Sequence, residues 1–155
     1  IRGVIYPEHM NELGSVSDPK KLYPVGKRVH VRILRISREQ HSLICTAKRT
    51  LLREETPILT DIEKAETDAE YVGTVSEIMP GGVMIHFFNG ICGFIPTNEL
   101  QRRNLRAEEI YKKGRIAHVR VKGVDRMKNR VIIVPVDGDD SIEKLIVGMR
   151  LRDDT

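Results

Sequence analysis

The sequence predicts an all-β protein made of two copies of a small five-stranded unit, the first of them incomplete. Three observations lead to this fold class: tight glycine turns between short apolar strands, an internal repeat with an offset of about 90 residues, and period-2 alternation on the strands of both copies. A chain of 155 residues is long enough for one domain or two small ones. Aromatic residues make up only 5% and charged residues 31%, a composition typical of small, highly solvated modules.

The stretch Glu70–Leu100 predicts three of these strands. Pro80–Gly82 and Asn89–Gly90 interrupt its apolar runs, and both segments contain residues that tolerate the positive φ of tight turns. Gly93–Pro96 is the short third strand. Strands joined by turns this short pair as an antiparallel meander.

Side-chain alternation after the first turn separates a buried face from an outward face. Phe87 shares its parity with Ile85 and is predicted to lie in the core, whereas Met84, His86 and Phe88 take the outward positions. Phe88 either contacts a ligand or covers the end of the barrel.

The internal repeat consists of two aligned blocks. Gly3–Met10 aligns with Gly93–Leu100 at an offset of 90, and Tyr23–Cys45 aligns with Tyr111–Ile133 at an offset of 88. A loop between the blocks can absorb the slip of two residues. The first copy therefore begins at its third strand, and its two opening strands are expected to precede Ile1.

The fourth strand of each copy has an apolar face that is predicted to be buried: Val29, Val31 and Ile33 in the first copy, and Ala117, Val119 and Val121 in the second. Each copy contains a His-Val-Arg phrase on this strand. Its His and Arg take the alternate positions and are predicted to face solvent: His30 and Arg32 in the first copy, His118 and Arg120 in the second. A fifth strand closes each unit, and helix-compatible residues lie between strands three and four. Five strands in about 70 residues predict tandem Greek-key barrels of the OB type, with a two-sheet sandwich as the alternative.

Charge divides the chain at the boundaries that the repeat suggests. We expect residues 1–50 to be the end of one barrel, 51–70 an acidic linker, 71–136 a complete barrel, and 137–155 an acidic linker toward a possible third copy. The net charge is +7 over residues 1–53 and −6 over 54–70, within a total of +4. We interpret each barrel as presenting cations to the phosphates of a nucleic-acid ligand, while the acidic joint, residues 51–70, stays off that ligand. The alternative is that the charges only keep the chain soluble and that the joint is a solvated linker.

Several function classes find no support in the sequence. The five histidines lack metal-site spacing, and no nucleophile–base–acid set or phosphate-binding loop is present. Cys45 and Cys92 are interpreted as reduced residues of an intracellular protein. No apolar run approaches the ~20 residues of a membrane span. We therefore expect no enzyme activity, cofactor, metal, membrane contact or small-molecule substrate.

The phrases GGVMIHF, GICGFIPTNEL, YKKGRIAHVRVKGVD and NRVIIV resemble the S1 RNA-binding domain, a five-stranded OB barrel. The resemblance covers Tyr71–Val136 fully and Gly3–Lys48 as the last three strands of a preceding copy. The divergent tandem copies and the Thr56–Leu59 linker are similar to the large multi-S1 ribosome-biogenesis proteins of the eukaryotic nucleolus. Bacterial ribosomal S1 proteins are a second group of relatives.

This resemblance implies an RNA-binding and scaffolding role in pre-ribosomal RNA processing and small-subunit precursor assembly, in the nucleolus. The implied partners are pre-ribosomal or small nucleolar RNA and other ribosome-assembly proteins. The alternatives are a protein–protein docking module, or an accessory RNA-binding domain of a ribosomal protein, nuclease or translation factor.

The family's RNA-stacking positions are changed in the second copy. Where the family usually has aromatic residues and a His, this chain has Gly81, Met84 and Pro96, which predicts weak base stacking because each stacked base contributes ~1–3 kcal/mol. In the first copy Tyr6 holds the His position. Arg102, Arg103 and Arg106 form a basic knot near the short helix, which is either an RNA clamp or a solvated face. The full set of candidate RNA contacts is Tyr6, Arg32, Met84, His86, Phe88, Arg102, Arg103, Arg106, His118, Arg120, Arg126, Lys128 and Arg130.

Overall fold

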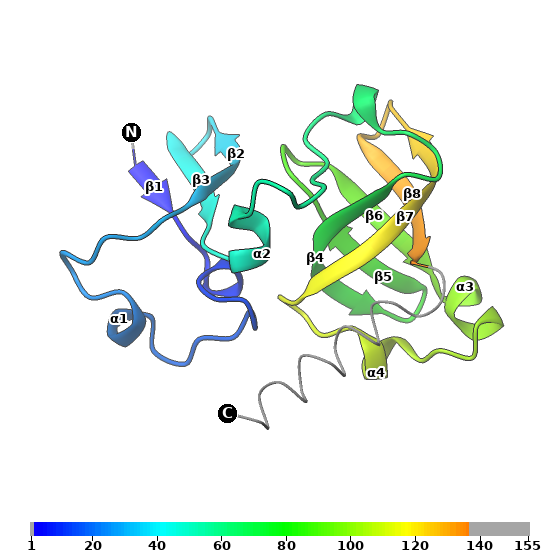
Figure 1. Ribbon diagram of the computed structural model, residues 1–155, viewed down its shortest axis with the longest axis horizontal. Coiled ribbons are helices and arrows are strands. Elements are labelled where there is room, and N and C mark those ends of the chain that lie inside the picture. The colour runs from blue at the N-terminus through cyan, green and yellow to red at the C-terminus, as the bar shows by residue number, and fades with distance from the viewer. Residues whose placement is uncertain (1, 137–155) are drawn as a thin grey trace.

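The computed structural model describes residues 2–136, which form a three-stranded sheet followed by a closed five-stranded barrel (Figure 1). The small sheet has the order β1-β3-β2, from β1 (Arg2–Val4), β2 (Arg32–Ser37) and β3 (Ser42–Thr46). The barrel has the order β4-β5-β6-β8-β7, from β4 (Glu70–Met79), β5 (Gly82–His86), β6 (Cys92–Pro96), β7 (Ile116–Asp125) and β8 (Arg130–Pro135). The mainly β fold and one barrel are confirmed, but the first half is a sheet and not a second closed barrel. The predicted linker over 137–155 lies outside the described residues.

The predicted glycine turns shape the barrel meander. Asn89 and Gly90 have φ of +56° and +78°, as the turn between β5 and β6 requires. Gly82 has φ of +155°, and a Cβ there would lie 2.2 Å from the carbonyl oxygen of Ile95. The chain therefore needs glycine where β5 begins against β6. Bulges in β4 and β7 add the local twist that helps a small barrel close.

Alternating residues of all five strands fill the barrel interior. Phe87 is 6% exposed, which confirms its predicted place in the core. Gly93 leaves room for this ring, because a Cβ there would lie 2.8 Å from Phe87 and 2.7 Å from Ile133. The core includes Leu59, Ala65, Val75, Val83, Ile85, Phe87, Ile91, Ile95, Leu100, Tyr111, Ala117, Val119, Val121, Val131 and Ile133.

Short helices occupy the connections. The predicted helical segment between strands three and four is present as α3 (Thr97–Arg102) and α4 (Ala107–Ile110). The remaining short helices in the described part of the chain are η1 (Pro7–His9), α1 (Pro19–Leu22), α2 (Arg49–Leu52) and η2 (Ile62–Lys64). Within residues 2–136, no helix has the length and apolar character that crossing a membrane would require.

The two copies of the repeat pair their strands in the same register. β1 runs parallel to β3 with Gly3 opposite Leu43, and β6 runs parallel to β8 with Gly93 opposite Val131. The β2–β3 ladder also matches the β7–β8 ladder at an offset of 88, including the position of its bulge. The small sheet therefore reproduces the β6-β8-β7 part of the barrel, strand for strand.

One predicted core face lies at the surface. Val31 and Ile33 are 43% and 48% exposed, whereas their counterparts Val119 and Val121 are 0% exposed. In the second copy a closed barrel surrounds these side chains, but among residues 2–136 the small sheet has no further strands to cover them. The prediction of a buried face was therefore right for Val119 and Val121 and wrong for Val31 and Ile33.

Residues 51–70 pack on the barrel and do not form a free linker. Leu51 packs with Val72 and Phe88, and Leu59 and Ala65 belong to the barrel core. A backbone hydrogen bond also holds the segment to the barrel, because the Phe88 amide donates to the Leu59 carbonyl at 3.1 Å. This segment is part of the folded unit that the barrel forms.

Candidate nucleic-acid interface

The outer surface of β5, β6 and β8 presents a row of apolar side chains. Met84 lies opposite Phe94, and Phe94 lies opposite Ile132, which is 42% exposed. The Phe94 ring covers the glycine turn, since a Cβ on Gly82 would be 2.6 Å from its Cζ atom. In OB folds the face of the second and third strands, here β5 and β6, binds oligonucleotides.

Phe94 is the aromatic residue of this face that sequence reasoning missed. Its signal was available, because Gly93 and Ile95 are buried core neighbours and the residue between them must point outward. Phe94 is half-buried and lies beside the predicted outward residue Met84. The barrel thus has one outward aromatic ring although the family's usual stacking positions lack aromatic residues.

A second row on the same strands is polar. His86 lies opposite Cys92, and Cys92 lies opposite Arg130. His86 and Arg130 are both exposed, and the β7–β8 turn beside them exposes Arg126 and Lys128. The structure therefore brings four predicted contact residues to one side of the barrel.

Phe88 lies in the interior and not on this face. It is 3% exposed and packs with Leu51 and Val72, so its ring has no face open to a base. β5 ends at His86, and the Phe88 carbonyl accepts a hydrogen bond from the Ile91 amide at 3.2 Å within the turn. Of the two roles considered for Phe88, the structure supports the covering one.

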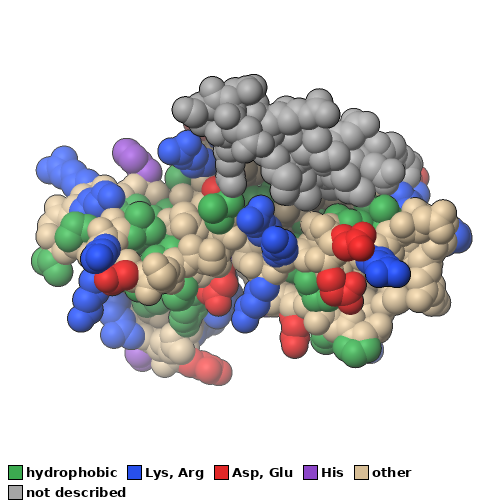
Figure 2. Space-filling model, turned by 90° about the horizontal axis from the view of Figure 1, so that it is seen from below, with side chains coloured by type: hydrophobic (Ala, Val, Ile, Leu, Met, Phe, Trp, Pro, Cys, Tyr) green, Lys and Arg blue, Asp and Glu red, His purple; other side chains and the backbone are tan. Residues whose placement is uncertain are grey.

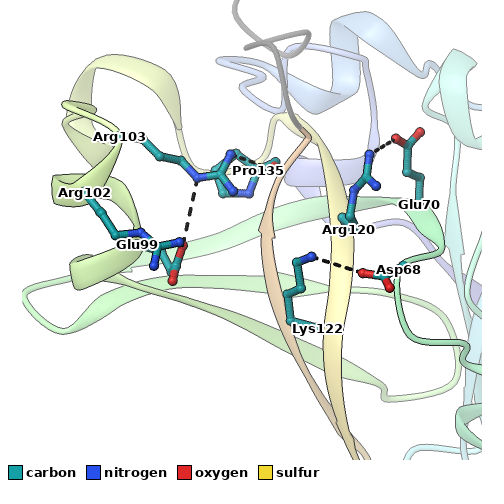
Figure 3. Close-up of polar contacts among 8 residues, drawn as sticks. All are labelled: Asp68, Glu70, Glu99, Arg102, Arg103, Arg120, Lys122 and Pro135. Carbon is teal, nitrogen blue, oxygen red and sulfur yellow. Dashed lines mark hydrogen bonds and ion pairs between the residues drawn. The ribbon is translucent and has the colours of Figure 1, made fainter.

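The acidic joint pairs with three cations of β7 and its turn, of which Arg120 and Arg126 are predicted RNA contacts. Glu70 binds Arg120 at 2.8 Å and Asp68 binds Lys122 at 3.0 Å, both visible in Figure 3. Farther along, Glu63 binds Arg126 at 3.1 Å. We name these three carboxylates, Glu63, Asp68 and Glu70, the acidic strip.

Backbone bonds hold the acidic strip against β7. The Asp68 amide donates to the Val121 carbonyl at 2.8 Å, and the Val121 amide donates to the Ala69 carbonyl at 2.9 Å. These bonds extend the β4–β7 ladder beyond the start of β4. The acidic joint therefore lies against the cations of β7 and its turn, an arrangement that the charge pattern alone did not predict.

The basic knot separates into one anchored and two exposed residues. Arg103 donates to the Pro135 carbonyl at 3.3 Å and lies 3.9 Å from Glu99, which ties α3 to the end of β8 (Figure 3). Arg102 also binds Glu99, at 3.1 Å, but its side chain is 74% exposed. Arg106 is exposed as well. Arg102 and Arg106 therefore remain accessible to a phosphate backbone, whereas Arg103 is committed to the fold.

A cleft of about 790 Å³ lies between the small sheet and the barrel. Tyr6, His9 and Arg35 line the sheet side, and β4, His86 and Lys113 line the barrel side. Arg35 was not among the predicted contacts, because nothing in the sequence indicates that β2 lies across from β5. The remaining predicted contacts, Arg32 and His118, are half-buried on their strands.

Burial and neighbouring cations keep the cleft histidines neutral. Burial, with Lys48 and His86 nearby, lowers the pKa of His9 to about 4, and His9 Nδ1 lies 2.7 Å from the hydroxyl of Thr46. Partial desolvation of the His86 ring beside the cleft lowers its pKa as well, and the Arg35 guanidinium adds to this effect. At neutral pH both imidazoles are therefore uncharged and able to accept a hydrogen bond.

Lys48 is a buried cation behind the cleft. It is 0% exposed, and its Nζ atom donates to the carbonyls of Asn11 at 2.8 Å and Glu12 at 3.1 Å. Burial lowers its pKa to about 8, an effect that the carboxylate of Glu12 opposes and that Arg115 reinforces. Through these bonds Lys48 holds the Asn11–Glu12 loop to the start of α2, so its role is structural.

The distribution of surface charge differs between the two parts of the chain. Figure 2 shows Lys and Arg side chains spread over the part built by the first fifty residues, on the left, with some Asp and Glu among them, and both signs side by side over the barrel. Among residues 2–136, no three His, Cys, Asp or Glu side chains gather closely enough to hold a metal ion. The chemistry of the described surface is that of cations, carboxylates and a few apolar rings.

Comparison with known proteins identifies the barrel. The family model described as "S1 RNA binding domain" matches residues 64–134, which span the barrel together with part of the acidic strip. Residues 64–134 are an S1 RNA-binding domain. The resemblance read from the sequence motifs is thereby confirmed.

The similar curated proteins fall into two groups. The chain is 28% identical over 126 residues to the rRNA biogenesis protein rrp5 of Schizosaccharomyces pombe, covering 81% of this chain and 7% of that protein. It is 25% identical over 134 residues to the human protein RRP5 homolog, covering 86% and 7%. It is also 28% identical over 109 residues to the small ribosomal subunit protein bS1 of Helicobacter pylori, covering 69% and 20%. The chain thus spans only a small part of each relative.

Proposed function

We propose that this chain is an RNA-binding and scaffolding segment of a ribosome-assembly factor, active in pre-ribosomal RNA processing and small-subunit precursor assembly in the nucleolus. The observation that carries the proposal is the S1 domain at 64–134, within a chain that is similar over most of its length to rRNA biogenesis proteins. Pre-ribosomal or small nucleolar RNA and other assembly proteins would be its partners.

Two features of the barrel support RNA contact. Phe94, Met84 and Ile132 supply an apolar surface on which a base can stack, and Arg130 and Lys128 stand beside it as exposed cations. Stacking on a single ring and a few phosphate contacts give weak affinity. Linked modules gain affinity through their effective concentration, so weak contacts suffice in an array.

The salt dependence of RNA binding tests this proposal. A protein that neutralises phosphates of a single strand loses affinity with a slope of about −0.7 per phosphate in log K against log salt. We expect titration with a labelled single-stranded RNA between about 50 and 300 mM salt to give a slope of about −2 to −4. The absence of binding at the lowest salt concentration would reject the function.

We also propose that residues 1–50 are the last three strands of another S1 barrel. The identical register of β1-β3-β2 and β6-β8-β7 supports this, and so does the exposure of Val31 and Ile33, which a closed barrel would bury. Amide hydrogen exchange in the full-length gene product tests it. Protection of β2 equal to that of β7 is expected, whereas a β2 that exchanges freely would contradict it.

Protein docking is the second candidate function. The ion pairs of the acidic strip and the loss of the family's stacking positions at Gly81 and Pro96 favour it. Crosslinking of assembled precursors would then map this segment to assembly proteins and not to RNA.

A further inference from the structure

We propose that the cleft between the small sheet and the barrel binds one nucleotide of a single-stranded RNA, with Tyr6 stacking on the base and Arg35 and Lys113 contacting phosphates. This inference rests on the RNA binding proposed above and gives it a definite place. The cleft is then a second RNA-contact site, formed at the junction of two repeat units, besides the outer face of the barrel.

The junction is fixed at two points. The Asn89 amide donates to the Leu34 carbonyl at 2.8 Å, which joins the β5–β6 turn to β2. Elsewhere the backbones of Gly14 and Gly114 touch, since a Cβ on Gly14 would lie 2.3 Å from the Gly114 oxygen. Both glycines have positive φ, +76° and +86°, so other residues are disfavoured at this contact. The cleft of about 790 Å³ therefore has walls of defined spacing, and its volume falls in the ~300–1,000 Å³ range of ligand sites.

The cations of the cleft are available, unlike those of β7. Arg35 and Lys113 are exposed and have no carboxylate within ion-pair distance among residues 2–136. Arg120, Lys122 and Arg126 are all paired with the acidic strip. A phosphate can therefore bind Arg35 or Lys113 without displacing a carboxylate of residues 2–136.

The remaining lining suits a nucleobase. Tyr6 is 39% exposed, and its hydroxyl makes no hydrogen bond within the described residues, so its ring is open to stacking. Thr74 and Ser76 bring hydroxyl groups to the barrel wall, and neutral His86 offers an acceptor.

The charges of the cleft distinguish RNA from an acidic peptide. Glu8 and Glu77 line it together with the two cations. Carboxylates accept hydrogen bonds from the amino groups of bases. They repel the side chains of an acidic peptide. A nucleotide, which has phosphates at one end and amino groups at the other, satisfies both kinds of charge.

The test compares matched variants of this chain. The probe is a single-stranded RNA of about 12 nucleotides, within the range that one OB fold covers, with one 4-thiouridine for crosslinking. Tyr6→Ala removes the ring and Tyr6→Phe keeps it. Arg35→Gln removes a cleft cation, and Arg38→Gln makes the same charge change on an exposed Arg outside the cleft. Thermal unfolding confirms that each variant is folded.

We expect Tyr6→Ala and Arg35→Gln each to weaken binding about fivefold to hundredfold, with Tyr6→Phe and Arg38→Gln within about twofold of the parent chain. Crosslinks should fall on peptides that contain Tyr6 or Lys113, which line the cleft and do not belong to β5 or β6. If the parent binds RNA but the four variants bind alike and crosslinks fall on the outer face of β5 and β6, the cleft is rejected and the proposed function stands. If the parent does not bind RNA at low salt, the proposed function itself fails.

Discussion

Neutralising the acidic strip is expected to strengthen RNA binding. The triple variant Glu63→Gln, Asp68→Asn and Glu70→Gln keeps the size of each side chain and removes the partners of three cations. Exposed ion pairs of this kind contribute about 0.2–1 kcal/mol each, and RNA must displace them to reach the cations. Removing all three competitors should therefore raise affinity about threefold to a hundredfold, since 1.4 kcal/mol corresponds to a factor of ten.

The salt slope provides an independent reading of the same prediction. Three cations released to single-stranded phosphates would steepen the slope by up to about 2, at roughly 0.7 per contact. Fluorescence anisotropy with the labelled RNA at several salt concentrations measures both affinity and slope. Stability should fall by no more than about 3 kcal/mol in urea unfolding, because each of the three surface pairs contributes at most about 1 kcal/mol.

A matched variant controls for the change in net charge. Glu54→Gln, Glu55→Gln and Glu108→Gln remove the same total charge from exposed residues that pair with no cation in the described part of the chain. If both triple variants gain the same affinity and slope, the acidic strip acts only through net charge, and the reasoning from the ion pairs is refuted.

Three further predictions concern stability and the exposed cations. Gly93→Val should lower the free energy of unfolding by about 1–3 kcal/mol in urea, because it overpacks the core. Gly3→Val is the matched control in the small sheet and should be nearly neutral, because a Cβ there has no atom within 4 Å; equal effects of the two variants would contradict the packing argument. The pKa of His9 is lowered to about 4 in the folded state, so the unfolded state binds more protons between roughly pH 4 and 6.5. The free energy of unfolding should therefore fall by about 2 kcal/mol from pH 7 to pH 5. His9→Gln should flatten that part of the profile, and an unchanged profile would exclude His9 as its source. Arg102→Glu with Arg106→Glu should weaken RNA binding at an unchanged melting temperature, and unchanged binding would remove both residues from the interface.

The barrel could be predicted from sequence because its determinants are local. Glycines with positive φ marked the turns, alternation assigned Phe87 to the core, and the repeat predicted which strands of the small sheet correspond to strands of the barrel. Phe88 was harder to place, because β5 ends at His86 and alternation no longer applies in the turn that follows. Parity is informative only while the strand continues.

The exposed face of β2 and the ion pairs of the acidic strip show a second limit. Alternation predicts which residues share a face, but whether that face is covered depends on strands elsewhere, and β2 lacks the ones that β7 has. Charge counts correctly separated an acidic segment from basic ones. They could not show that residues 61–70 run back along β7, since backbone bonds to Val121 and the burial of Ala65 determine that path.

The ion pairs of the acidic strip change where RNA contact is expected on this chain. Arg120 and Arg126 are among the predicted contacts, yet carboxylates of the same chain pair with both of them and with Lys122. An RNA must compete with the acidic strip there, whereas Arg35 and Lys113 in the cleft require no such exchange. If both sites bind, the cleft should be occupied first and the β7 cations only as the strip is displaced. Measuring the crosslink ratio of Tyr6 to β7 peptides against RNA concentration tests that order, which neutralising the acidic strip should abolish.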